Sequence, residues 1–168
     1  LRDSKKLSPQ QRGEVFAYLQ EVVEIGVGIV SSEEIDRVGL QRANVVAVER
    51  AISHLRSRLS GGRSNLVNPT EQTRLLPFDK LRAGWSLDAG LAKEIVVDYI
   101  GAFKKYTTLK ENYSLHKFGE STFPEIAAAS IIAKVTRDRL MVELAKEFPQ
   151  YGFELHKGYG TRLHQEGL

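Results

Sequence analysis

Residues 118–139 read FGESTFPEIAAASIIAKVTRDR, and this stretch decides the fold. It places a carboxylate, Glu120, on a Gly-Glu-Ser turn and then opens a helix that we expect to run from Thr122 to Phe148. The first turns of that helix carry almost only small residues, which let a neighbouring backbone or a ligand come close. A hydroxyl, a lysine and an arginine follow at i, i+4 and i+7 on one helix face: Ser130, Lys134 and Arg137.

Patterns typical of strands and helices alternate along the rest of the chain. β-Branched and apolar runs predict strands over 22–30, 94–99 and 113–118. Caps and apolar spacing predict helices over 9–20, 32–39 and 41–59. Such alternation indicates an α/β sheet, in which ligand sites gather at the carboxyl ends of strands. Asp98 lies at one of these ends.

The chain has 168 residues, 42% of them hydrophobic and 27% charged, which is typical of a single globular domain over 1–168. Residues 60–92 lack sustained periodicity and are rich in Gly, Pro, Ser, Asn and Asp. We interpret them as an insertion, since a loop of this length needs an explanation. The only tryptophan, Trp85, lies there, and we expect it to cover local apolar surface.

The composition restricts the kind of site. There is no cysteine, which excludes disulfides and thiolate metal sites. A metal would need oxygen or imidazole ligands, which favours Mg²⁺ or Mn²⁺. The net charge of +3 is weak support for a nucleic-acid partner. No apolar run is long enough to span a bilayer and no signal segment is visible, so we expect no membrane partner and a cytoplasmic location.

Asp98 and Glu120 are the two carboxylates that could carry chemistry. A buried strand rarely finishes in a carboxylate unless something pairs with it. Spacing alone leaves two structural explanations open, a salt bridge and a helix N-cap. The alternative is that both carboxylates converge on divalent metal, where two ions can hydrolyse a phosphodiester.

The chain resembles the type 2 ribonucleases H (ribonuclease HII) through motifs that occur in the family's order. The matching segments run from the first residue to the C-terminal loop: Leu1–Ser8 (LRDSKKLS), Ser31–Asp36 (SSEEID), Val96–Asp98 (VVD), Gly119–Ser121 (GES), Ala127–Asp138 (AAASIIAKVTRD) and His156–Thr161 (HKGYGT). The resemblance implies an α/β ribonuclease H-like fold, a mixed sheet flanked by helices. It implies hydrolysis of the RNA strand of RNA–DNA hybrids and of single ribonucleotides embedded in duplex DNA.

The resemblance also assigns roles to residues. Asp98 and Glu120 would be catalytic metal ligands for Mg²⁺ or Mn²⁺. The substrate-binding residues would be five in number, with Tyr159 reading the RNA–DNA junction: Lys5, Ser130, Lys134, Arg137 and Tyr159. We interpret Asp138 as a structural or salt-bridging residue instead of a metal ligand.

The chain departs from the family pattern in three ways. The family's Asp-Glu-Ala-Gly-Arg-Gly motif, expected before Asp3, is absent, so we expect a fragment that lacks the first strand or strands and is inactive alone. Glu120 replaces the usual aspartate, and Tyr99 stands where the commonest bacterial version has glycine. The alternative is a catalytically dead nucleic-acid-binding module on the same fold. A type 3 ribonuclease H is a weaker possibility. We expect a monomer, although a missing first strand would expose a sheet edge through which chains could associate.

Overall fold

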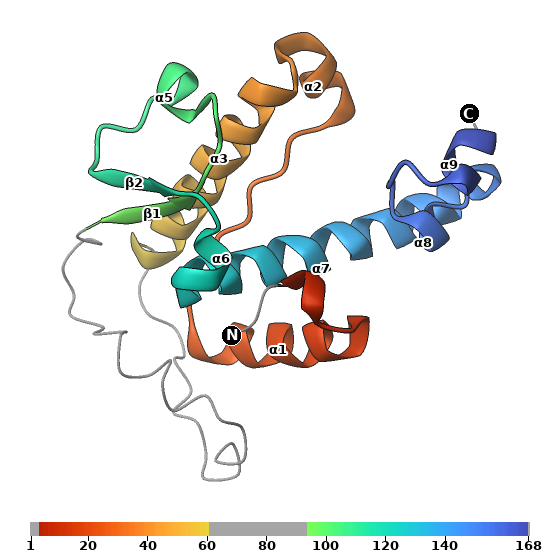
Figure 1. The fold of residues 1–168 in the computed structure, drawn as a ribbon, viewed down its shortest axis with the longest axis horizontal. Helices are drawn as coiled ribbons and strands as arrows, with labels where there is room; N and C mark the ends of the chain where they lie inside the picture. Colours follow the sequence, from red (N-terminus) through yellow and green to blue (C-terminus); the bar gives the residue numbers. More distant parts are fainter. Residues whose placement is uncertain (1–3, 61–93, 168) are drawn as a thin grey trace, which may run out of the picture.

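The computed structural model describes residues 4–60 and 94–167 (Figure 1). The insertion predicted over 60–92 and Trp85 therefore lie almost entirely outside the described residues. The chain is of the α/β class, mostly helical with a small parallel sheet, consistent with a ribonuclease H-like fold. The elements follow in this order: η1 Ser4–Lys6, α1 Pro9–Val22, α2 Ser32–Val38, α3 Leu40–Ser60, β1 Ile95–Asp98, α5 Phe103–Tyr106, β2 Tyr113–His116, α6 Gly119–Thr122, α7 Pro124–Glu147, η3 Pro149–Tyr151, α8 Phe153–His156 and α9 Arg162–Glu166.

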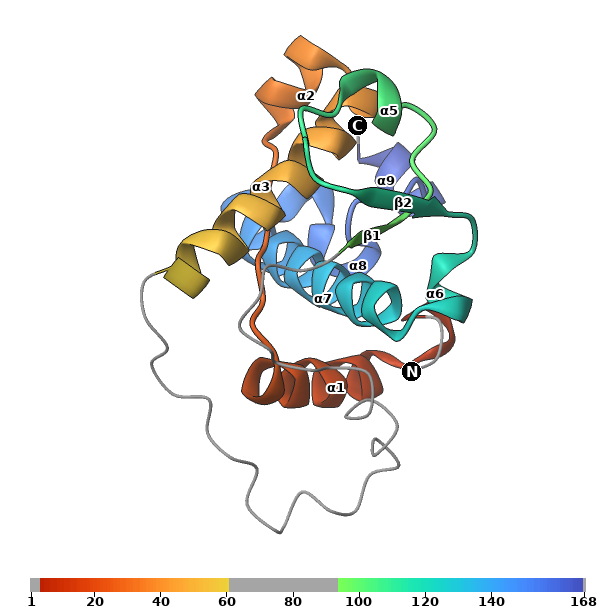
Figure 2. The same cartoon turned by 90° about the vertical axis from the view of Figure 1, so that its left-hand side faces the viewer.

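The helix α7 forms the centre of the domain, with α1 on one side and the sheet and α3 on the other (Figure 2). The helix predicted over 122–148 is confirmed, except that Phe123 separates the short α6 from α7. Pro124 begins α7 at the first helical position, where a missing N–H costs nothing. Two small residues near its start, Ala127 and Ala128, are buried, and Ala128 packs in the core that α7 shares with α1. This core is formed by Phe16, Leu19, Ala128, Ile131, Ile132 and Val135.

The sheet consists, within the described residues, of β1 and β2 in parallel. Asp98 pairs with His116 in the register, so the carboxyl ends of both strands lie at one edge. A second core joins the sheet to α3 and α5 through Val45, Val97 and Phe103, which are 0%, 8% and 0% exposed. The strands predicted over 94–99 and 113–118 are confirmed, although β2 ends two residues before Phe118.

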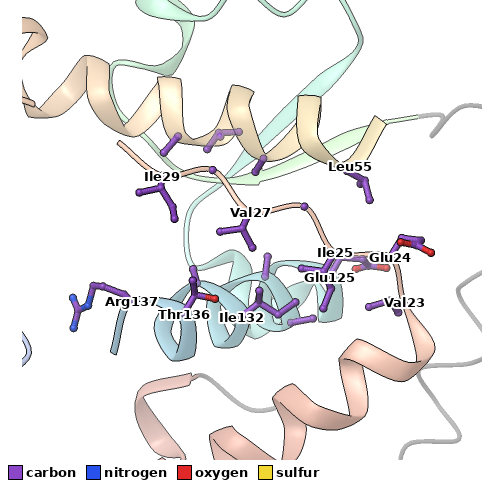
Figure 3. Close-up of a pocket in the computed structure, with 18 of the residues that line it drawn as sticks. Val23, Glu24, Ile25, Val27, Ile29, Leu55, Glu125, Ile132, Thr136 and Arg137 are labelled. Carbon is purple, nitrogen blue, oxygen red and sulfur yellow. The ribbon is translucent and has the colours of Figure 1, made fainter. Parts of the chain in front are cut away.

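The strand predicted over 22–30 is wrong. Residues 24–30 have no regular hydrogen-bonded structure, and no described strand pairs with them. The segment instead runs between α3 and α7 (Figure 3). β-Branched residues favour an extended backbone, but a strand also needs a neighbour for its ladder.

Side chains of α3 replace part of the missing ladder. Arg50 Nη1 donates to the carbonyl oxygen of Ile29 at 2.6 Å, and Arg58 Nη1 donates to that of Ile25 at 3.4 Å. His54 Nδ1 lies 3.2 Å from both the amide nitrogen and the carbonyl oxygen of Val27. Backbone polar groups need a partner, and here helix side chains provide it.

The three predicted helices before the insertion are confirmed as α1, α2 and α3. Ser8 and Ser31 cap α1 and α2, each in a capping box, and Gly39 ends α2 with a positive φ of 80°. No described helix is long and apolar enough to cross a membrane.

Candidate active site

Asp98 is the last residue of β1, at the sheet edge where ligands bind in α/β folds. Asp98 is exposed, and its Oδ1 accepts a hydrogen bond from the amide of Gly119 at 3.3 Å. Gly119 begins α6 and directly precedes Glu120. The hydrogen bond therefore places one candidate carboxylate beside the turn that carries the other.

The Glu120 carboxylate is held by two serines from distant parts of the chain. Ser130 Oγ donates to Oε1 at 2.8 Å. The amide and hydroxyl of Ser4 donate to Oε2 at 3.3 and 3.5 Å. The two hydroxyls are themselves 2.8 Å apart. Ser4, Glu120 and Ser130 thus form one network that joins η1, α6 and α7, and we call it the serine–glutamate network.

The two carboxylates fit a hard divalent cation by the chemistry of their donors. Mg²⁺ is commonly held by one or two carboxylates, with water and substrate oxygens completing its shell. A carboxylate has about four lone-pair positions, so the serine contacts leave acceptor capacity on Glu120. Among the described residues, no ion pair involves Asp98 or Glu120, so the salt-bridge explanation has no support there. The same residues contain no cluster of three or more metal-ligating side chains.

The capping explanation has structural support for Asp98. Its contact with Gly119 reaches the first residue of α6, as a cap from outside the helix would. This contact uses only one carboxylate oxygen. It is compatible with a metal-binding role for the other oxygen.

A second cluster lies one turn further along α7 from Ser130. Lys134 Nζ donates to Tyr159 OH at 3.0 Å and to Asp138 Oδ1 at 2.8 Å. The Arg137 guanidinium lies over the Tyr159 ring, 4.3 Å from its centroid, and Nη2 donates to Asp138 at 3.3 Å. We call these four residues the tyrosine cluster. The interpretation of Asp138 as a salt-bridging residue is confirmed.

Electrostatics in the tyrosine cluster favour an anionic neighbour. The hydrogen bond from Lys134 lowers the pKa of the Tyr159 hydroxyl below its usual value, and the nearby Arg137 adds to the effect. Asp138 supplies one negative charge against two cations. Tyr159 is 50% exposed, so a partner can reach the ring between the glycines at 158 and 160. The arrangement suits a phosphate with an adjoining sugar or base.

The structure divides the predicted substrate residues into two groups. Lys134, Arg137 and Tyr159 come together, whereas the Ser130 hydroxyl turns toward Glu120. Lys5 is exposed and follows Ser4, so the serine–glutamate network places its backbone beside the carboxylates. Asp3 lies outside the described residues. All five residues remain candidates for substrate contact.

Sequence reasoning missed two residues beside the site. Ser4 is 4% exposed and binds Glu120, and its only signal was its position in the Asp-Ser-Lys-Lys motif. Phe118 is 85% exposed and directly precedes Gly119. Its hydrophobic side chain predicted the end of a buried strand, so no sequence signal pointed to the surface.

An apolar cavity of about 570 Å³ lies between residues 23–30, α3 and α7 (Figure 3). Its lining is mostly aliphatic, with Ile25, Val27 and Ile132 among the residues, and neither Asp98 nor Glu120 belongs to it. Arg137 reaches one end, and its Nε is buried with no hydrogen-bond partner in the described part of the chain. The cavity therefore offers little of the polar chemistry that phosphodiester hydrolysis requires.

Comparison with known proteins places these features in a family. The family model described as ribonuclease HII matches residues 87–168. The ribonuclease HII of Fusobacterium nucleatum is 37% identical over 168 residues, which is 100% of this chain and 63% of that protein. That of Treponema denticola is 34% identical over 172 residues, 100% of this chain and 75% of that protein. That of Thermus thermophilus is 36% identical over 169 residues, 99% of this chain and 64% of that protein.

The chain spans less than two thirds of the Fusobacterium relative and 49% of the ribonuclease HII of Parvibaculum lavamentivorans. The likeness nevertheless extends over the whole of this chain, at 31–37% identity to relatives that all carry the same name. The family model covers the part that contains Asp98, Glu120 and the tyrosine cluster. On these grounds the chain belongs to the ribonuclease HII family.

Proposed function

We propose that this chain forms part of a metal-dependent endoribonuclease. It would hydrolyse the RNA strand of RNA–DNA hybrids and cut at single ribonucleotides embedded in duplex DNA. The observation that carries the proposal is the hydrogen bond from Gly119 to Asp98, which brings Asp98 beside Glu120 at the carboxyl edge of the sheet. With no described cation paired to either carboxylate, their negative charges are available for Mg²⁺ or Mn²⁺.

The chain's own residues would prepare the reaction. Bound divalent ions would activate water and stabilise the leaving 3′-oxygen. Asp98 and Glu120 would supply oxygen ligands, while Ser4 and Ser130 keep the Glu120 carboxylate oriented before substrate binds. The amide of Gly119 does the same for Asp98. Fixed ligands reduce the reorganisation needed at the moment of reaction.

The substrate would lie across α7, from the serine–glutamate network to the tyrosine cluster. Lys134 and Arg137 would contact phosphates, and Lys5 would contact the backbone near Ser4. The Tyr159 ring would pack against the sugar at the junction between ribonucleotide and deoxyribonucleotide. Ser130 would contact the substrate only from its position beside Glu120. We include in the proposal a monomeric enzyme that acts in the cytoplasm.

The test is a nicking assay on a duplex that carries one ribonucleotide, in Mg²⁺ or Mn²⁺. We expect no nicking by the 168-residue chain alone, and nicking when a segment with the Asp-Glu-Ala-Gly-Arg-Gly motif is fused before Leu1. In that fusion Asp98→Asn should abolish nicking. Asp36→Asn, an exposed carboxylate on α2, is the matched control and should leave it intact. Nicking that survives Asp98→Asn would refute the metal-site assignment.

A nucleic-acid-binding module without activity is the second candidate. It is favoured by the hydrogen bonds at Glu120, since each of its oxygens already accepts from a serine. The same assay separates the two functions. A fusion that binds the duplex as tightly as a ribonuclease HII relative, but never nicks it, would support the binding module.

A further inference from the structure

Phe118 is the most exposed large hydrophobic side chain in the described residues, at 85%. Its backbone is left-handed, with φ 59° and ψ 33°. For a bulky residue this conformation is unfavourable, and an exposed ring gains no packing to offset it. A strained residue whose side chain makes no packing contact is a reason to look for a function of that side chain.

The strained turn lies in the connection from β2 to α6, at the carboxyl edge of the sheet (Figure 1). Gly119 is buried, and a Cβ there would collide with Ile126. Its amide holds Asp98. The turn therefore points the glycine inward to the carboxylates and leaves the Phe118 ring in solvent beside them.

A second exposed aromatic residue flanks Asp98 on the other strand. Tyr99 is 51% exposed and directly follows Asp98, and its amide donates to the carbonyl oxygen of His116 at 3.0 Å. Lys117 Nζ lies 5.1 Å from the centroid of the Tyr99 ring. Lys117 thus contacts Tyr99, and Phe118 follows Lys117 directly in the chain. We call these two rings and one ammonium group the aromatic patch.

The chemistry of the aromatic patch matches a nucleotide. Exposed rings bind bases by stacking, and an ammonium group beside them binds the phosphate. Two further exposed lysines, Lys5 and Lys6, follow Ser4, whose amide donates to Glu120, which adds positive charge near the site. A nucleic-acid strand is therefore favoured over an apolar protein surface, which would offer the Lys117 ammonium group no counter-charge.

We propose that the aromatic patch binds a nucleotide of the strand that passes Asp98 and Glu120, with Phe118 and Tyr99 stacking on bases and Lys117 contacting a phosphate. This inference rests on the proposed function, because it places the strand by the carboxylate pair. It adds a contact outside α7, in the residues that directly follow β1 and β2. The two side chains that would make this contact are Tyr99 and Phe118.

The test measures binding without cleavage. A fluorescein-labelled duplex with one ribonucleotide is titrated with the 168-residue chain in EDTA, and fluorescence anisotropy gives Kd. We expect Phe118→Ala to weaken binding about tenfold, the loss typical of one stacked base, and Tyr99→Ala to weaken it as well. The matched control is Phe148→Ala at the far end of α7, where the ring is 42% exposed, and it should not change Kd.

Two further variants separate contact from folding. Phe118→Gly removes the ring and also the strain, so it should raise Tm while weakening binding as much as Phe118→Ala does. Phe118→Trp keeps a stacking ring and should retain wild-type Kd. Abasic sites placed one at a time in the duplex should weaken wild-type binding at one position beside the ribonucleotide, and Phe118→Ala should lose that sensitivity.

The outcomes distinguish the inference from the proposed function. If the wild-type chain binds the duplex and Phe118→Ala and Tyr99→Ala bind it equally well, the aromatic patch is not a nucleotide contact and the proposed function stands. If Phe118→Gly and Phe118→Trp weaken binding equally, the effect is not stacking, which also overturns the inference. If the wild-type chain does not bind the duplex at all, the inference is overturned, whereas the proposed function is decided separately by nicking with the fusion.

Discussion

Ser130→Ala tests whether the serine–glutamate network stabilises the fold. The change removes the hydrogen bond from Ser130 Oγ to Glu120 Oε1, at 2.8 Å, and the 2.8 Å contact with Ser4 Oγ. A hydrogen bond to a charged group contributes about 1.5–3 kcal/mol. The Ser4 hydroxyl keeps only the longer contact to Glu120, at 3.5 Å, although Ser4 is 4% exposed.

We expect Ser130→Ala to lower the free energy of unfolding by about 2 kcal/mol. Glu120 is only partly buried, so water compensates some of the loss and the lower half of the range applies. For a chain of this size the corresponding fall in Tm is about 4–8 °C. Urea unfolding followed by circular dichroism measures the free energy, and a thermal scan measures Tm.

The controls separate this network from general effects of removing a hydroxyl. Ser121→Ala lies on the exposed side of α6 and should change the unfolding free energy by less than about 0.5 kcal/mol. Ser130→Thr keeps a hydroxyl and should recover part of the loss. In a double-mutant cycle, Ser130→Ala and Glu120→Gln should be non-additive, because the two side chains are in direct contact. Wild-type stability in Ser130→Ala would refute the reasoning.

Two further predictions concern the segment before α3 and its helix contacts. Gly28→Ala would drive a Cβ into the carbonyl oxygen of Ala47, so we expect the free energy of unfolding in urea to fall by about 1–3 kcal/mol. Gly13→Ala has open space around the new Cβ and should raise the free energy of unfolding by up to about 1 kcal/mol. Equal stabilities of the two variants would contradict the packing. Arg50 lowers the pKa of Glu34 to about 2 from 4.5, and a carboxyl group whose pKa is lower in the folded state stabilises the fold above its unfolded pKa. That stabilisation is lost as pH falls from 4.5 toward 2, so Glu34→Gln should lose less stability over this window in acid titrations, and an unchanged slope would refute the pairing.

The helices were predictable because their signals are local. Ser8 and Ser31 sit three residues before Gln11 and Glu34, and both pairs form the capping boxes that this spacing predicts. Pro124 begins α7 as its fixed φ requires. The strands β1 and β2 were also predictable, and each has a partner in the same sheet.

The segment over 24–30 could not be predicted in the same way. Its residues favour an extended backbone, and the backbone is extended, but a strand is defined by a neighbour that lies far away in sequence. Here the groups that satisfy its carbonyl oxygens are side chains of α3, including Arg50 and Arg58. Periodicity within a window carries no information on such a partner.

The candidate site shows the same division. Residue types and motif order identified Asp98, Glu120 and Tyr159 as candidates. A carboxylate at a strand end and a tyrosine between glycines can both be recognised from the sequence alone. The helical spacing also placed Lys134 and Arg137 on one face, and both contact Tyr159. It did not show that the Ser130 hydroxyl on this helix turns to Glu120, ten residues earlier in the chain.

The sequence by itself determined the helices α1, α2, α3 and α7, the two strands, the family resemblance and the identity of the candidate carboxylates, since each depends on residue types at short spacing. Only the tertiary structure decided that Ser4 joins Glu120 from 116 residues away, and that Phe118 faces solvent beside the carboxylates. The physical reason is that hydrogen bonds and exposure depend on which elements pack together. In this chain η1, α6 and the sheet edge pack around α7, and this packing determines which side chains form hydrogen bonds and which are exposed.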